Sequence, residues 1–169
     1  MSDLKTSSIQ LSKAALVLAA ALLTSMVVFN NVTDYGSNFD FVRHVLSMDT
    51  TFPNNSGLWR RIEAPIAHHV AYVTIILVQC SIAALTWFGG LRMWRARGDA
   101  TRFNRSTAYA VQGLTVGVVL YVGGFLGIGG EWFLMWQSKI WNAQDAALRF
   151  ALVFAAILII VLRQESNER

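Results

Sequence analysis

The stretch IAHHVAYVTIILVQCSIAALTWFGGL, residues 66–91, decides the fold class of this chain. It contains no lysine, arginine, aspartate or glutamate, and most of its side chains are apolar. A helix that spans a bilayer needs about 20 consecutive residues of this kind. Three other stretches satisfy the same requirement, near residues 14–32, 107–130 and 143–162. The sequence therefore predicts an all-α membrane protein in which residues 1–169 form a single bundle of four transmembrane helices.

The composition supports this prediction. Hydrophobic residues make up 54% of the chain and charged residues only 14%, whereas soluble domains carry roughly 25% charged residues. The net charge of +4 could indicate nucleic-acid binding, but the basic residues lie at the ends of the apolar stretches, where they meet lipid headgroups. We therefore expect contact with a lipid bilayer and none with nucleic acid. The single cysteine, Cys80, excludes an intramolecular disulfide.

The positions of lysine and arginine predict the orientation of the chain, because cytoplasmic loops of membrane proteins carry an excess of both. With the N-terminus in the cytoplasm, nine of the 14 lysines and arginines fall on the cytoplasmic side. Most of this excess comes from the connection LRMWRARGDATRFNRS, residues 91–106. With four crossings, both termini are then expected to be cytoplasmic.

The first external connection, residues 33–65, has a helical pattern of its own. In NFDFVRHVLSMD, residues 38–49, apolar residues such as Val42 and Leu46 recur at the spacing of one helix face, with charged residues elsewhere on the wheel. We therefore expect a short amphipathic helix in this long loop. Pro65 suits the first turn of the following span, because that position needs no N–H donor.

Several segments of the chain, together with the four-span layout, match the pattern of a bacterial family. The segments are NFDFVRHVLSMDTTFP at 38–53, GLWRRI at 57–62, AHHVAY at 67–72, GEWFLMWQS at 130–138 and WNAQDAALRF at 141–150. Together they resemble the bacterial predicted small integral membrane proteins grouped as domain of unknown function 2165. The resemblance covers nearly the whole chain and implies a multi-pass protein of the bacterial cytoplasmic (inner) membrane. It implies no activity and no functional residues.

A stripe of polar side chains runs along the second predicted span. Its members recur at spacings of four, seven and seven residues, on one side of a helix, and are His68, Tyr72, Gln79 and Thr86. Because an unpaired polar group in hydrocarbon is costly, this side is expected to face protein. One interpretation is hydrogen bonding between helices. The other is a polar path or a quinone pocket.

The third predicted span is rich in glycine. Two small-xxx-small pairs, GLTVG and GGFLG, let helix backbones approach closely, and their glycines are Gly113, Gly117, Gly123 and Gly127. These glycines are expected to pack against other helices of the bundle or against another subunit.

Histidine and carboxylate side chains occur near the external ends of the predicted spans. Such side chains suit a transition metal, and the candidate ligands are His44, Glu63, His68 and Glu131. A haem with His44 and His68 as axial ligands is another form of this hypothesis. The alternative interpretation is a polar collar at the membrane surface, in which one histidine bonds Glu131 or a loop carbonyl.

Motifs of known chemistry do not occur in the sequence: it has no glycine-rich phosphate loop, nucleophile elbow, HExxH or CxxC. No ionisable residue is expected at mid-membrane depth, where proton-coupled transporters usually carry one. We therefore predict a non-catalytic protein without a cofactor. It would act as an accessory, assembly or stabilising subunit of a larger membrane complex, or as a homo-oligomeric scaffold. Two alternatives remain, a redox protein that binds a metal or haem and a small channel or transporter lined by Tyr72, Gln79 and Thr86.

Overall fold

The computed structural model describes residues 2–164, most of which are helical. The helices in chain order are α1 (Ser2–Thr33), α2 (Tyr35–Ser47), η1 (Ser56–Arg60), α3 (Pro65–Ala96), α4 (Ala100–Ser106), α5 (Ala108–Val119), η2 (Leu120–Trp132), η3 (Met135–Gln137) and α6 (Gln144–Leu162). No strand occurs between residues 2 and 164. The prediction of an all-α fold is confirmed for this part of the chain.

Four segments are long and apolar enough to cross a membrane, as the sequence predicts. They are Ser7–Thr33, Pro65–Ala96, Ala100–Trp132 and Gln144–Leu162. The first three extend beyond the predicted apolar stretches, because a helix that continues into its polar flanks keeps its backbone groups hydrogen-bonded. The third consists of α4, α5 and η2 in succession. Pro65 occupies the first turn of α3, where its missing N–H costs nothing.

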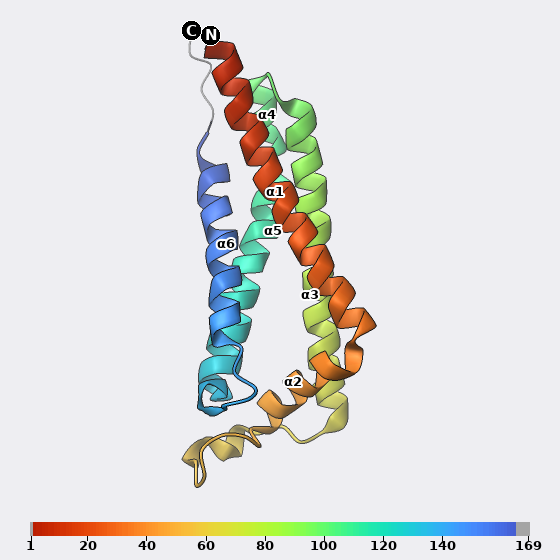
Figure 1. Ribbon diagram of the computed structural model, residues 1–169, viewed down its shortest axis with the longest axis vertical. Helices are drawn as coiled ribbons and strands as arrows, with labels where there is room; N and C mark the ends of the chain where they lie inside the picture. The colour runs from red at the N-terminus through yellow and green to blue at the C-terminus, as the bar shows by residue number, and fades with distance from the viewer. Residues whose placement is uncertain (1, 165–169) are drawn as a thin grey trace.

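The long helices run side by side along the length of the molecule (Figure 1). The start of α1 and α4 lie at one end, and α2 lies at the other. We refer to the two halves of the bundle by the short helix at each end. The α4 half comprises residues 7–20, 82–118 and 152–162, and the α2 half comprises residues 21–81 and 119–151.

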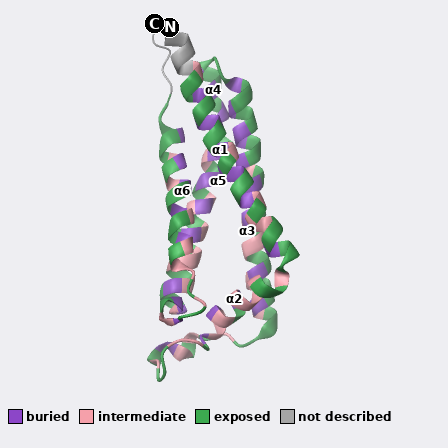
Figure 2. Cartoon of the chain, viewed as in Figure 1, coloured by how far each residue is buried: buried purple, intermediate pink, exposed green. Residues whose placement is uncertain are grey.

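The outer surface of the bundle is apolar. Large hydrophobic side chains are exposed on all four spans, among them Leu22, Leu77, Val119 and Ile159. Figure 2 shows exposed residues along the outward sides of the helices. Exposure of such a surface to water would cost about 25 cal/mol of free energy per Å². Exposure to hydrocarbon carries no such cost. The surface is therefore suited to contact with lipid.

In the α4 half, glycines bring helices into direct contact. A Cβ added at Gly89 of α3 would lie 2.4 Å from the backbone nitrogen of Ala110 in α5. A Cβ added at Gly117 of α5 would lie 3.0 Å from the ring of Phe154 in α6. Phe154 is fully buried. The absence of side chains at these glycines lets α3, α5 and α6 pack closely.

At the α2 end, the segment between α1 and α3 packs onto the segment between η2 and α6. A small buried cluster joins them and contains Val45, Met48, Phe133 and Met135. The side-chain oxygen of Gln137 accepts a hydrogen bond from the backbone nitrogen of Phe52, over 3.0 Å, and one from Asn55 Nδ2, over 2.9 Å. These bonds hold the segment before η1 to η3 and close this end of the bundle.

Beyond α5, the third span continues as a π-helix, which the sequence does not predict. The whole of η2 has this form. At its end, the backbone nitrogen of Phe133 donates to the carbonyl oxygen of Ile128, five residues earlier, over 2.9 Å. π-helical turns are rare and occur frequently at functional sites. Because η2 lines two cavities, the α2 half is the candidate region for such a site.

Candidate functional site

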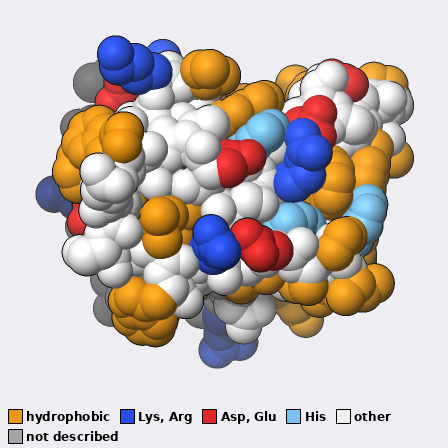
Figure 3. Space-filling model, turned by 90° about the horizontal axis from the view of Figure 1, so that it is seen from below, with side chains coloured by type: hydrophobic (Ala, Val, Ile, Leu, Met, Phe, Trp, Pro, Cys, Tyr) orange, Lys and Arg blue, Asp and Glu red, His pale blue; other side chains and the backbone are white. Residues whose placement is uncertain are grey.

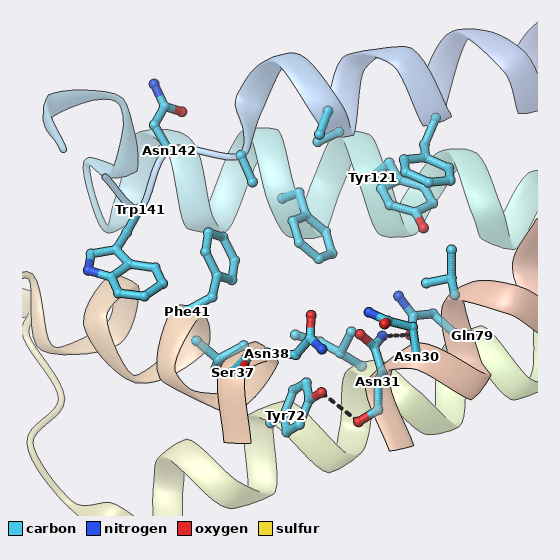
Figure 4. Close-up of a pocket in the computed structure, with 18 of the residues that line it drawn as sticks. Asn30, Asn31, Ser37, Asn38, Phe41, Tyr72, Gln79, Tyr121, Trp141 and Asn142 are labelled. Atoms are coloured by element: carbon cyan, nitrogen blue, oxygen red, sulfur yellow. Dashed lines mark hydrogen bonds between the residues drawn. The ribbon is translucent and has the colours of Figure 1, made fainter. Parts of the chain in front are cut away.

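A cavity of about 660 Å³ lies within the α2 half. Its walls come from α1, α2, α3, η2, α6 and the connection before α6. Figure 4 shows side chains from these elements converging on one space. The volume falls within the range of roughly 300–1,000 Å³ that is typical of small-molecule sites. We therefore treat this cavity as the candidate functional site and call it the polar cavity.

The polar groups of this cavity carry no formal charge. They are the amides and hydroxyls of Asn30, Asn31, Ser37, Asn38, Tyr72, Gln79, Tyr121 and Asn142. Among the lining residues there is no Lys, Arg, Asp, Glu, His or Cys. Amides and hydroxyls donate and accept hydrogen bonds without a net charge, whereas an ion here would lack a charged partner. The polar cavity therefore suits an uncharged polar group.

Asn31 connects α1 to α3 at the wall of the polar cavity (Figure 4). Its Nδ2 donates to Gln79 Oε1 over 2.7 Å, and its backbone oxygen accepts from the Tyr72 hydroxyl over 2.9 Å. All three side chains are buried. From the facing η2, Tyr121 interacts with the Gln79 side chain. This network fixes the positions of the amide and phenol groups around the cavity.

Aromatic rings form a continuous apolar wall of the polar cavity. Tyr121 stacks on Phe150 of α6 with ring centroids 4.7 Å apart, and packs against Phe125 at 5.5 Å. Phe41 of α2 extends the wall, with centroids 6.4 Å from Phe125 and 6.5 Å from Trp141. A wall of this kind offers a large apolar area of well-defined shape. It suits the ring or the chain of an apolar molecule.

The polar cavity opens on the side of the bundle, between α1 and the segment that leads into α6. The exposed lining residues are of two kinds: apolar Leu23, Met26 and Ile140, and polar Asn30, Ser37 and Asn142. Leu23 and Met26 belong to the apolar surface that α1 presents to hydrocarbon, so one edge of the opening is apolar. A molecule would enter the cavity sideways rather than along the axis of the bundle.

A second cavity of about 340 Å³ lies between α2, α3 and η2. Its side chains are apolar except for that of Thr74. Four residues line both cavities and separate them: Phe41, Val42, Ile75 and Phe125. A space with polar groups and a space without them therefore adjoin each other in the α2 half.

The predicted polar stripe of α3 is buried along its whole length, but its members have different partners. His68 Nε2 donates to the carbonyl oxygen of Ile62 over 2.7 Å, so it bonds a loop carbonyl and fixes the start of α3. Thr86 donates to carbonyl oxygens of its own helix. Of the four residues of the stripe, Tyr72 and Gln79 line the polar cavity, and His68 and Thr86 do not.

Several residues of the polar cavity are absent from the sequence-based candidates. Asn31 and Tyr121 come from other helices, and Trp141 comes from the connection before α6. For Asn31 a signal exists, because two asparagines at the end of an apolar stretch are costly in hydrocarbon unless they have partners. Tyr121 and Trp141 carry no such signal, since aromatic residues are frequent at membrane interfaces.

The four predicted packing glycines fall into two pairs. Gly113 and Gly117 are buried, and a Cβ added at Gly113 would lie 2.9 Å from Thr86 Cγ2 of α3. Gly123 and Gly127 are exposed on η2, and a Cβ added at Gly123 would have no neighbour within 4 Å. The first pair therefore packs within the bundle, whereas the second pair faces away from it.

Two pairs of oppositely charged side chains lie at the α2 end. Arg43 and Asp40 are 3.2 Å apart, and Arg61 Nε and Glu63 Oε1 are 3.1 Å apart. Figure 3, which views this end of the molecule, shows acidic, basic and histidine side chains interspersed on one face. Exposed pairs of this kind contribute little to stability. They fit a polar collar at a membrane surface.

The four predicted metal ligands are not brought together. His44 Nδ1 lies 2.7 Å from Asp49 Oδ2, Glu63 pairs with an arginine, and His68 bonds a carbonyl. Glu131 is exposed. Among the residues that the structure describes, no group of three or more His, Cys, Asp or Glu side chains is arranged to hold a metal ion. The metal and haem hypotheses stay predictions without a ligand cluster in this part of the chain.

Comparison with known proteins agrees with this architecture. A family model described as "Predicted small integral membrane protein (DUF2165)" matches residues 9–164. Searches among curated proteins and among solved structures found no match. The family resemblance that the sequence suggests is confirmed, because the match covers most of the chain. The chain belongs to the family of predicted small integral membrane proteins with domain of unknown function 2165, and its four apolar helices contact the lipid bilayer.

Proposed function

We propose that this protein is a non-catalytic accessory subunit of a larger complex in the bacterial cytoplasmic membrane, and that it holds one uncharged amphiphilic molecule of the bilayer in the polar cavity. The observation that carries the proposal is the lining of the cavity: neutral amides and phenols next to an aromatic wall, with the exposed apolar side chains of Leu23 and Met26 at one edge of its opening. A carbonyl or hydroxyl head with an apolar chain matches both parts. Isoprenoid quinones and diacylglycerols have this chemistry.

The lining favours holding such a molecule over transforming it. None of the lining residues supplies a carboxylate, imidazole, thiol or amine, which are the groups that most often transfer protons or attack substrates. Chemistry on the bound molecule would then come from a partner protein, and this supports an accessory role. Gly123 and Gly127 provide a face of η2 outside the bundle against which a partner helix could pack closely.

Ligand analysis of the purified protein tests the holding function. The protein is extracted in mild detergent, and bound molecules are identified by native mass spectrometry and lipid extraction. We expect one uncharged amphiphile per chain. Ala146→Phe fills part of the polar cavity and should abolish this binding, because Ala146 lines it. The matched control is Ala156→Phe on the exposed side of α6, which should retain the molecule. Equal occupancy in both variants, or only charged phospholipids in the wild type, would contradict the proposal.

The accessory role has a separate test, which is the native mass of the complex extracted from its own membrane. We expect a species larger than one chain. A Gly123→Leu substitution should reduce its mass without unfolding the bundle, since a Cβ at this position would have no neighbour within 4 Å beyond its own stretch of helix. A strictly monomeric species that carries no other protein would count against the accessory role while leaving ligand binding intact.

The orientation is part of the same proposal, with both termini in the cytoplasm, and labelling of introduced cysteines tests it. In a Cys80→Ser background, Ser56→Cys lies at the α2 end and Thr101→Cys lies in α4; both positions are exposed. A charged maleimide added to intact spheroplasts should label Ser56→Cys at once and Thr101→Cys only after permeabilisation. The reverse pattern would place the arginine-rich connection outside.

A further inference from the structure

A hollow of about 420 Å³ lies at the opposite end of the molecule, where α3 connects to α4. We propose that it is a binding site for the phosphate of an anionic phospholipid headgroup. Four arginines line it, and they are Arg92, Arg95, Arg102 and Arg105; Asp99, Thr101 and Ser106 contribute polar groups. This site is separate from the polar cavity and does not depend on the function proposed for it.

Among the residues that the structure describes, the arginines of this hollow form no ion pair with a carboxylate. Asp99 is the one acidic residue in the lining, and its carboxylate already accepts a hydrogen bond from the backbone nitrogen of Arg102 over 2.9 Å, as the cap of α4. The Arg–carboxylate pairs among the described residues join Arg43 to Asp40 and Arg61 to Glu63, at the other end of the bundle. A ligand with negative charge would balance these arginines.

One arginine is held in place by aromatic rings. The guanidinium carbon of Arg92 lies 5.4 Å from the ring centroid of Phe88 in α3 and 5.5 Å from that of Tyr109 in α5. The two rings pack edge to face, with centroids 4.8 Å apart. A guanidinium on an aromatic face still presents its N–H groups at its edge, in the geometry that matches phosphate oxygens. Arg92 is thus oriented in advance for an anion.

The backbone that carries the other arginines is also fixed. The side-chain oxygen of Gln10 in α1 accepts a hydrogen bond from the backbone nitrogen of Gly98 over 2.7 Å, and Gln10 is fully buried. Gly98 has a φ of 93°, which a residue with a Cβ rarely adopts. Phe103 of α4 is buried in the core. The turn and α4 therefore hold the arginines at defined positions.

The side chains around the hollow indicate a lipid as the source of the phosphate. Phe88, Trp94 and Tyr109 are exposed around it, and Arg97 packs on Trp94 at 5.1 Å. Aromatic and basic residues of this kind gather where hydrocarbon gives way to headgroups. Lipid phosphates lie at this level of a bilayer, so the hollow meets them directly.

A native mass-spectrometric titration of the full chain in detergent, with phosphatidylglycerol and with zwitterionic phosphatidylcholine, tests this inference. We expect preferential binding of phosphatidylglycerol. The double substitution Arg95→Gln and Arg102→Gln should weaken it by about tenfold or more, since two charge-assisted hydrogen bonds are lost. The matched control, Arg97→Gln with Arg163→Gln, removes the same charge at the same end outside the hollow and should change binding less than about twofold.

Three results would overturn the inference. In the first, the variant with Arg95→Gln and Arg102→Gln binds phosphatidylglycerol as tightly as the wild type does. In the second, both double variants lose binding equally, which would mean that net charge rather than the hollow determines the affinity. Displacement of the lipid by excess inorganic phosphate would show that the hollow takes a free anion instead. Arg95→Lys with Arg102→Lys keeps the charge and guards against misfolding of the glutamine variant. It should retain weaker but still selective binding, because lysine cannot bind phosphate bidentately.

Discussion

The α4 half and the α2 half consist of the same four spans but pack in different ways. In the α4 half, Gly89, Gly113 and Gly117 face neighbouring helices at distances that leave no room for a side chain. In the α2 half, two cavities separate the helices, and Gly123 and Gly127 face outward. Glycine content alone therefore does not produce close packing. The direction in which each glycine faces decides it.

This difference divides the molecule into a part that stabilises the bundle and a part that is available for binding. Close packing gains dispersion contacts at every glycine interface, whereas a cavity gives up such contacts along its walls. The hydrogen bonds of Asn31 compensate in part by connecting α1 to α3 beside the polar cavity. Substitutions in the two halves should consequently have different consequences.

The largest loss of stability is expected for Gly89→Ala. The new Cβ would lie 2.4 Å from the backbone nitrogen of Ala110, which cannot move without displacing α5. We expect a loss of about 1–3 kcal/mol, the usual cost of overpacking, measured by unfolding in mixed detergent micelles. The control is Gly124→Ala in η2, where the nearest atom outside the helix backbone would lie at 3.6 Å. Equal unfolding curves for the two variants would contradict the contrast between the halves.

An intermediate effect is expected for the hydrogen bond between Asn31 and Gln79. A double-mutant cycle with Asn31→Ala and Gln79→Ala should give a coupling energy of about 1 kcal/mol, as for other hydrogen bonds between membrane helices. The same cycle with Asn30→Ala, one position away and exposed, should give no coupling. Coupling to Asn30 as strong as to Asn31 would mean that α1 is rotated relative to the structure.

The smallest effect on stability is expected for Gly123→Ala and Gly127→Ala. Both side chains would point away from the bundle, so unfolding should change by less than about 0.5 kcal/mol. Any larger consequence should appear only in the mass of the extracted complex. Strong destabilisation of the isolated chain would show that this face packs inside the bundle.

The sequence predicts the four spans well, because the length of an apolar stretch follows directly from the thickness of hydrocarbon. It also places Tyr72 and Gln79 together, since their spacing puts both on one side of α3. These features depend on one helix at a time. No knowledge of the neighbouring helices is needed to derive them.

The features that the sequence does not predict arise between helices. The polar cavity depends on the divergence of α1 from α6 toward the α2 end (Figure 1), which no residue pattern along one helix encodes. The π-helical form of η2 depends on a shift of backbone hydrogen bonds by one residue, and a glycine-rich sequence is compatible with either form. Gln137 is similar, because its role depends on Phe52 and Asn55 being adjacent to it in space.

An experimental structure of the protein in lipid nanodiscs that contain membrane extract from its host would examine the polar cavity most directly. We expect α1 and the segment before α6 to stay apart, with elongated density between them whose head lies within hydrogen-bonding distance of Gln79, Tyr72 or Tyr121. The apolar part should leave through the opening beside Met26. Helices that close onto each other with no density between them would contradict the account.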